Sequence, residues 1–99
     1  MENITVEELK KYITTDLFGT RVLDLSERKL SKVPEAVTDL TDLEELKLSQ
    51  NSLVELPTNI LNKLKNLTHL YLDNNQLSQL PETIDELTNL IWLDVKKNN

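Results

Sequence analysis

The sequence contains no cysteine, one glycine, one histidine and four aromatic residues among its 99 positions. Without cysteine, neither a disulfide framework nor a thiolate metal site is available. A single glycine cannot form a glycine-rich phosphate loop, and the single histidine, His69, cannot build a zinc site alone. No nucleophile is expected beside His69 either. We therefore predict that the chain is not an enzyme and that it binds no metal and no cofactor.

The chain is also poor in positive charge and in long apolar runs. Eleven basic residues against 17 acidic residues give a net charge of −6. Such a charge repels phosphate backbones, so a nucleic acid is not an expected partner. No run of about 18 apolar residues is present, so we expect no membrane span. The first residues lack the basic and apolar regions of a signal peptide, and we therefore predict one cytoplasmic domain.

Leucine, in contrast, occupies 21 positions and recurs with a fixed period. Registers that begin at Thr20, Leu43, Leu67 and Leu90 align with spacings of 23, 24 and 23 residues. The second and third registers read LEELKLSQNSLVELPTNI and LTHLYLDNNQLSQLPETI. A period of this length is the sequence signature of a repeat architecture. We therefore divide the chain into a leading segment, 1–19, and the repeats 20–42, 43–66, 67–89 and a partial 90–99.

This pattern resembles the leucine-rich repeat family, L-x-x-L-x-L-x-x-N-x-L-x-x-L-P-x-x-I. The short Leu-Pro-x-x-Ile form is similar to repeats of Ras-group proteins and of bacterial intracellular proteins. The resemblance covers residues 20–99 and implies an α/β solenoid, with a parallel sheet on its concave side and short helical turns on its convex side. It also implies a non-catalytic module that binds a protein ligand on the concave face.

The residues support this fold independently. Leu46 and Leu48 alternate with polar neighbours, which is typical of a half-buried strand. Pro57 follows and suits the first turn of a short helix. An asparagine amide can bond the backbone of adjacent turns, so we expect a structural ladder at Asn51, Asn75 and Asn98. Arg28 occupies the equivalent position in the first repeat and has no acceptor, so this rung should be imperfect.

The leading segment carries the signals of a capping helix. Thr5-Val6-Glu7-Glu8 matches a capping box, and the apolar stripe continues to Ile13, so we predict a helix over about residues 6–14. Terminal repeats need a cover, and the apolar face of this helix, with Tyr12 and Phe18, should provide it. The alternative of a membrane or partner helix is weaker because the polar face lacks a basic cluster.

Strand alternation predicts the binding surface. The leucines of each strand should point inward, and their neighbours should form lateral rows on the opposite face. Aromatic residues anchor interfaces disproportionately, so Tyr71 and Trp92, with His69 beside them, are the expected centre of the site. A sheet also tolerates exposed aromatics without any function, which is the alternative. The complete predicted protein-binding set is His69, Tyr71, Trp92, Glu45, Lys47, Asp73, Asp94 and Lys96.

The last partial repeat suggests a second surface. Leu90, Leu93 and Val95 should belong to a terminal strand whose outer side has no covering turn and whose backbone groups lack partners. Two interpretations remain open. The chain is either a recognition fragment of a larger leucine-rich repeat signalling protein, or an assembly unit that forms a homodimer through its C-terminal end about a two-fold axis.

Overall fold

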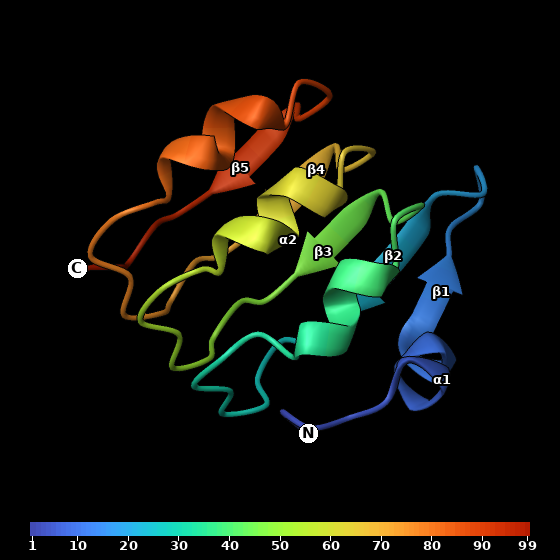
Figure 1. Cartoon of the computed structure of the whole chain (residues 1–99), viewed down its shortest axis with the longest axis horizontal. Coiled ribbons are helices and arrows are strands. Elements are labelled where there is room, and N and C mark those ends of the chain that lie inside the picture. Colours follow the sequence, from blue (N-terminus) through green and yellow to red (C-terminus); the bar gives the residue numbers. More distant parts are fainter.

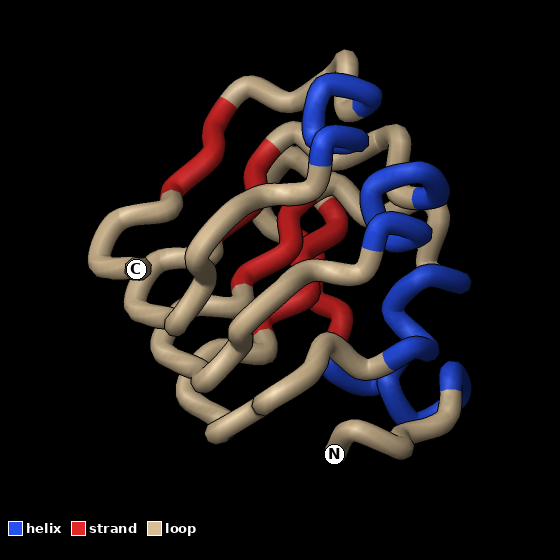
Figure 2. Tube along the Cα trace, turned by 60° about the vertical axis from the view of Figure 1, so that its left-hand side comes forward, coloured by secondary structure: helices blue, strands red, loops and turns tan.

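The computed structural model describes all 99 residues. Its centre is a five-stranded sheet in the order β1-β2-β3-β4-β5, with short helices on one side (Figures 1 and 2). The strands are β1 (Ile13–Thr15), β2 (Arg21–Asp24), β3 (Glu45–Lys47), β4 (His69–Tyr71) and β5 (Trp92–Asp94). The helices are α1 (Val6–Leu9), α2 (Thr58–Lys63) and the 3-10 helices η1 (Lys10–Tyr12), η2 (Glu35–Asp39) and η3 (Glu82–Glu86). No helix is long and apolar enough to cross a membrane.

Each repeat contributes one strand to the sheet, and β2 to β5 run parallel. The pairing register places the residues that share a repeat position side by side, because one period of the sequence forms one coil of the chain. One such row lies on the inner face and consists of Leu23, Leu46, Leu70 and Leu93. The first three of these are at most 1% exposed, whereas Leu93 on the last strand is partly buried.

The core consists of 20 buried apolar residues, most of them leucine. Proline stands directly before each of the three short helices of the repeats, and Pro57 precedes α2. From α2, Ile60 and Leu61 are buried against the strand leucines. Burial of a leucine-sized side chain contributes about 1.5–3 kcal/mol, so packing between sheet and helices is the main source of stability in coils this short.

The leading segment differs from the helix predicted for residues 6–14. The capping box forms, with the Thr5 hydroxyl accepting from the Glu8 amide, and Leu9 is fully buried. However, the helical conformation ends at Tyr12, and Ile13–Thr15 form β1, which pairs antiparallel with β2. The prediction was therefore wrong for residues 13–14, and the sheet is mixed rather than wholly parallel. Three β-branched residues in succession favour a strand once a free strand edge lies beside them.

The turn between β1 and β2 does not place Phe18 where it was expected. Phe18 is 92% exposed and Leu17 is 99% exposed, so Phe18 does not cover the N-terminal end. The Asp16 carboxylate accepts hydrogen bonds from the backbone amides of Phe18 and Thr20, at 2.8 and 2.9 Å. Gly19 completes the turn with φ of +79°, a conformation that glycine adopts without steric cost. The chain therefore reverses in a tight loop that holds both apolar side chains in solvent.

Candidate functional site

The outward face of the sheet brings most of the predicted site residues together. Because the leucine row points inward, the residues on either side of it in each strand point outward. One outward row consists of Val22, Glu45, His69 and Trp92, and the next consists of Asp24, Lys47, Tyr71 and Asp94. Asp73 and Lys96 lie two residues beyond these rows, where β4 and β5 have ended. The strand register therefore places all eight predicted residues on three neighbouring strands and their ends.

Aromatic rings occupy the centre of this surface. The rings of His69 and Tyr71 stack at a centroid distance of 6.4 Å, and Trp92, level with His69 on the next strand, is 51% exposed. The Lys47 ammonium lies 5.6 Å from the centre of the Tyr71 ring. Burial raises the pKa of the Tyr71 hydroxyl, and the nearby charges of Glu45 and Asp94 raise it further. The Tyr71 ring thus has charges of both signs beside it.

His69 has polar neighbours on both sides. Its Nδ1 lies 2.9 Å from the Thr68 hydroxyl and 3.7 Å from a carboxylate oxygen of Glu45. The Thr68 contact orients the imidazole, and Glu45 places a carboxylate beside it. No group of three or more histidine or carboxylate side chains is placed to hold a metal ion.

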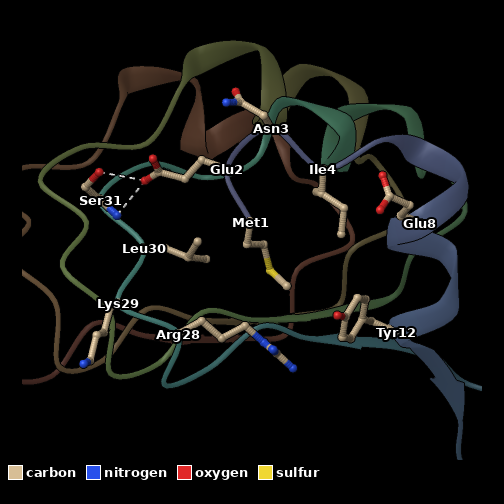
Figure 3. A pocket seen from close by; sticks show the side chains of 10 residues that line it. All are labelled: Met1, Glu2, Asn3, Ile4, Glu8, Tyr12, Arg28, Lys29, Leu30 and Ser31. Carbon is tan, nitrogen blue, oxygen red and sulfur yellow. Dashed lines mark hydrogen bonds between the residues drawn. The ribbon is translucent and has the colours of Figure 1, made fainter.

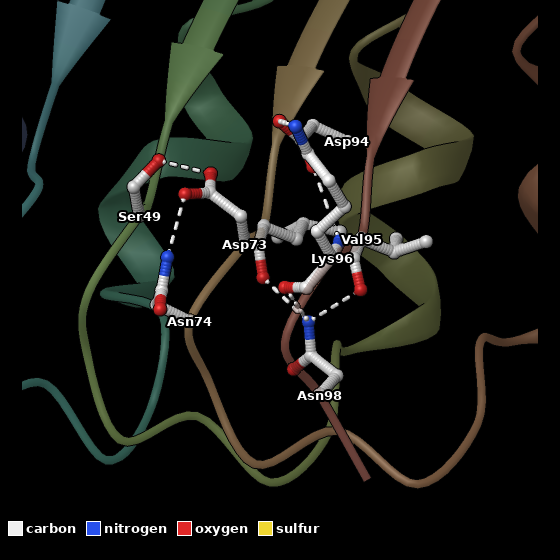
Figure 4. A network of polar contacts seen from close by, with 8 residues as sticks. Ser49, Asp73, Asn74, Asp94, Val95, Lys96 and Asn98 are labelled. Carbon is white, nitrogen blue, oxygen red and sulfur yellow. Dashed lines mark hydrogen bonds and ion pairs between the residues drawn. The ribbon is translucent and has the colours of Figure 1, made fainter.

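Where β3, β4 and β5 end, a polar network links the strands (Figure 4). Asp73 accepts hydrogen bonds from the Ser49 hydroxyl at 2.5 Å and from the Asn74 amide at 3.0 Å. Burial raises the pKa of Asp73, but these hydrogen bonds outweigh it, so the pKa lies below its ordinary value. Lys96 pairs with Asp94 at 3.9 Å. Charged groups of both signs are therefore held in place beside the aromatic rings.

The side chains of the three repeat asparagines form hydrogen bonds with backbone groups and are not part of the outward face of the sheet. The Asn51 amide donates to the carbonyls of Leu25 and Leu48 at 3.0 and 3.1 Å, and its oxygen accepts from the Leu30 amide at 2.9 Å. Asn75 and Asn98 repeat this arrangement one and two coils further on. At the equivalent position, Arg28 instead places its guanidinium 4.9 Å from the ring centre of Tyr12. These side chains hold neighbouring coils together.

Sequence reasoning missed a recurring bend before each of these positions. Four residues that share a repeat position adopt left-handed backbone conformations with φ of 55–59°, namely Glu27, Gln50, Asn74 and Lys97. Only asparagine among them is a common residue in that region. No sequence signal marks this bend, because none of the four residues is glycine.

The N-terminal segment encloses a hollow of about 720 Å³ that the sequence did not predict (Figure 3). The two carboxylates that line the hollow already accept hydrogen bonds from other groups of the chain. Glu2 accepts from the backbone amides of Ser31 and Lys32 and from the Ser31 hydroxyl, at 2.7–2.9 Å. The hydrogen bond from the Ser31 side chain is the main cause that lowers the pKa of Glu2. Glu8 is used in the capping box. These contacts attach the N-terminus to the first repeat.

Comparison with protein-family models gives a match to a leucine-rich repeat region over residues 3–99. The match includes the leading segment as well as the repeats. No curated protein matches the chain.

Proposed function

This chain belongs to the leucine-rich repeat family, whose domains generally mediate protein–protein interactions, and we propose that it binds a protein ligand through the outward face of its sheet. The family is typically non-enzymatic. We propose that the chain is one domain, a solenoid in which residues 1–19 cover one end, the repeats form the body, and the sheet lines the concave side.

The exposure of Trp92 beside two other rings carries this proposal. The chain has one tryptophan, and half of its surface faces solvent on the strand next to His69 and Tyr71. Tryptophan and tyrosine are enriched among the residues that dominate binding energy, because a large rigid ring loses little entropy on binding. Glu45, Asp73 and the two lysines around the rings would set the orientation of the ligand and its rate of association.

The test uses the protein as bait and measures each captured protein separately. Tyr71→Ala and Trp92→Ala should each weaken binding of a true ligand, by about 30-fold if the ring contributes about 2 kcal/mol. Because Trp92 is the only tryptophan, its fluorescence also reports ligand binding directly. Val54→Ala is the matched control, since it shortens an exposed apolar side chain outside the strands. Equal binding by the wild type and by both site variants would refute the proposal.

Self-association through the C-terminal end is a second candidate function. On and beside β5, Ile91 is 75% exposed, Trp92 is 51% exposed and Val95 is 39% exposed. β5 also has a neighbouring strand on one side only. An edge of this kind can pair with another chain. The average particle mass in solution and the melting temperature should both rise with protein concentration. A monomeric mass at about 100 μM together with a constant melting temperature would exclude this function.

A further inference from the structure

The two edges of the sheet carry the most exposed large apolar side chains of the protein. β1 and β5 lie at opposite edges (Figure 1). Leu17 and Phe18 follow β1, and Ile91 immediately precedes β5. These three side chains are 99%, 92% and 75% exposed. Each edge therefore combines unpaired backbone groups with apolar surface.

The repeat pattern identifies the unpaired groups of β5. In the preceding repeat, the Thr68 carbonyl accepts from the amides of Ile91 and Trp92, and the Leu72 amide donates to the Asp94 carbonyl. Thr68 and Leu72 thus face the following coil. The equivalent groups one period later are the Ile91 carbonyl and the Val95 amide, with Leu93 between them. Since hydrogen-bonding direction alternates along a strand, the free edge presents the Ile91 carbonyl, both backbone groups of Leu93 and the Val95 amide.

The same reasoning applies to β1. The Asp16 amide donates to the Thr20 carbonyl, so Asp16 faces β2. Alternation then places Thr14 toward β2 as well, and leaves the Ile13 carbonyl and both backbone groups of Thr15 on the free edge. The Ile13 amide already donates to the Lys10 carbonyl at the end of η1.

The two free edges are suited to pair with each other in strand direction, in register and in which residues face outward. Ile13 is level with Leu23, and Leu23 belongs to the row that ends at Leu93. By the same rows, Thr15 is level with Ile91. β1 runs opposite to β2, so it also runs opposite to β5. A second copy placed beside the first, in line with its sheet, would therefore bring edge-facing residues directly opposite edge-facing residues.

We infer that the self-association proposed above joins copies head to tail, with β1 of one copy added antiparallel to β5 of the next. Ile13 of one copy lies opposite Leu93 of its neighbour, and Thr15 lies opposite Ile91. Each pair can form one backbone hydrogen bond between copies, from the Leu93 amide to the Ile13 carbonyl and from the Thr15 amide to the Ile91 carbonyl, because the amides of Ile13 and Ile91 already donate within their own copy. Ile13 and Leu93 are each only partly buried within one copy, and both pack against the core, so the contact extends the core as well as the sheet.

The β1–β2 turn adds the apolar part of the contact. Thr15 stands opposite Ile91, so the turn that follows it lies over Leu90 and Ile91 of the neighbour. The Asp16 hydrogen bonds already hold this turn in shape, which lowers the entropy that Leu17 and Phe18 lose on binding. A dimer of two β5 edges about a two-fold axis would leave the turn in solvent. Head-to-tail pairing uses both apolar surfaces.

The charges near the edges make the contact sensitive to salt. Lys10 and Lys11 precede β1, whereas Lys96 and Lys97 follow β5. Antiparallel pairing brings these lysines to the same end of the contact. Lys10 already pairs with Glu7 and Lys96 with Asp94, so the repulsion there is between Lys11 and Lys97, and two copies of net charge −6 also repel each other. Salt screens such repulsion, so association should strengthen as ionic strength rises. The contact is also heterologous and does not close on itself, so chains of copies should lengthen with concentration.

The experiment measures mass by sedimentation from about 10 to about 500 μM protein, for the full chain and two edge variants. Leu17→Ser/Phe18→Ser removes the β1 half of the contact, and Ile91→Lys removes the β5 half. Val54→Ser is the matched control, because Val54 is 55% exposed and belongs to neither edge. All replaced side chains are solvent-exposed, and circular dichroism confirms that each variant folds.

Each outcome decides between the two arrangements. Head-to-tail pairing requires that the wild type and Val54→Ser form growing oligomers, that each edge variant alone is monomeric, and that an equimolar mixture of the edge variants stops at a dimer. If Leu17→Ser/Phe18→Ser still forms a dimer by itself, the inference is wrong but C-terminal self-association stands. If the wild type is monomeric throughout, both are wrong. Association that weakens as salt is raised also contradicts the head-to-tail arrangement.

Discussion

Replacing the asparagines of the ladder should lower the free energy of unfolding by an amount that depends on how many buried groups lose their only hydrogen-bond partner. Asn51→Ala removes the only partner of the Leu30 amide and of the Leu25 carbonyl, and also that of the Arg28 amide in a part-buried position. The Leu48 carbonyl is not orphaned, because it also accepts from Asn75 at 2.9 Å. Leu25 and Leu30 are both buried, and each buried group left without a partner costs about 1–3 kcal/mol. We therefore expect Asn51→Ala to lower the free energy of unfolding by about 3–4 kcal/mol.

Asn75→Ala should cost about half as much, although the two side chains look alike. It orphans the Leu53 amide, but the three carbonyls to which it donates each keep a second partner. These partners are Asn51 for Leu48, Asn98 for Leu72 and the Gln50 amide for Asp73. One buried orphan corresponds to about 1.5–2 kcal/mol. Asn98→Ala should cost about 1 kcal/mol, because it leaves the Leu77 amide in a part-buried position that water reaches more easily.

Urea unfolding measures these differences, with Asn66→Ala as the control because Asn66 is exposed and makes one bond, at 3.3 Å to the Thr41 carbonyl. A second series uses aspartate. An ionised carboxylate at position 51 keeps the acceptor for Leu30 but faces the Leu25 carbonyl without a donor, so Asn51→Asp should be as harmful as Asn51→Ala. Equal costs for Asn51→Ala and Asn75→Ala would refute the argument from orphaned groups.

Three further predictions concern the N-terminal segment. Leu9→Ala should cost about 2–5 kcal/mol in urea unfolding, whereas Val54→Ala should cost little, because Leu9 is fully buried and Val54 is 55% exposed; equal effects would contradict the packing of α1. Gly19→Ala should lower stability by about 1 kcal/mol through its positive φ alone, since no atom lies within 4 Å of the added methyl group; an unchanged melting temperature would contradict this. Hydrogen bonds lower the pKa of Glu2 and Asp16 below their ordinary values of 4.5 and 3.8. Their contribution to stability is therefore complete above the ordinary pKa and is lost as the pH falls through the folded-state pKa. Glu2→Gln should flatten the fall in melting temperature below about pH 5, and an unchanged acid slope would contradict this.

Much of the fold follows from the sequence alone because its signals are local and repeated. The 23–24-residue period places equivalent positions side by side, so the rows that contain His69 and Trp92 could be written down before the coils were seen. Proline before each short helix and alternating leucines in each strand act within a few residues. Such patterns determine the structure because every repeat forms the same strand and short helix from the same local signals.

The leading segment shows where local signals are insufficient. The capping box of Thr5 started a helix as predicted, yet the apolar stripe through Ile13 did not continue it. Whether residues 13–15 extend the helix or join a sheet depends on the free edge of β2, which exists only after the first repeat has folded. For the same reason the exposure of Leu17 and Phe18 could not be predicted, because the direction of the turn depends on that pairing.

Tertiary structure also decided how much each asparagine contributes to stability. The amides of Gln50 and Asn74, next to these asparagines, donate to carbonyls of the following coil at 3.0 and 2.9 Å, whereas Lys97 has the same positive φ in the last coil. The sequence placed Asn51 and Asn75 at equivalent positions, but only the stacking of coils determined which carbonyls have two donors and which have one. A repeat pattern specifies which residues are equivalent, whereas the energy of each depends on the neighbours that folding brings to it.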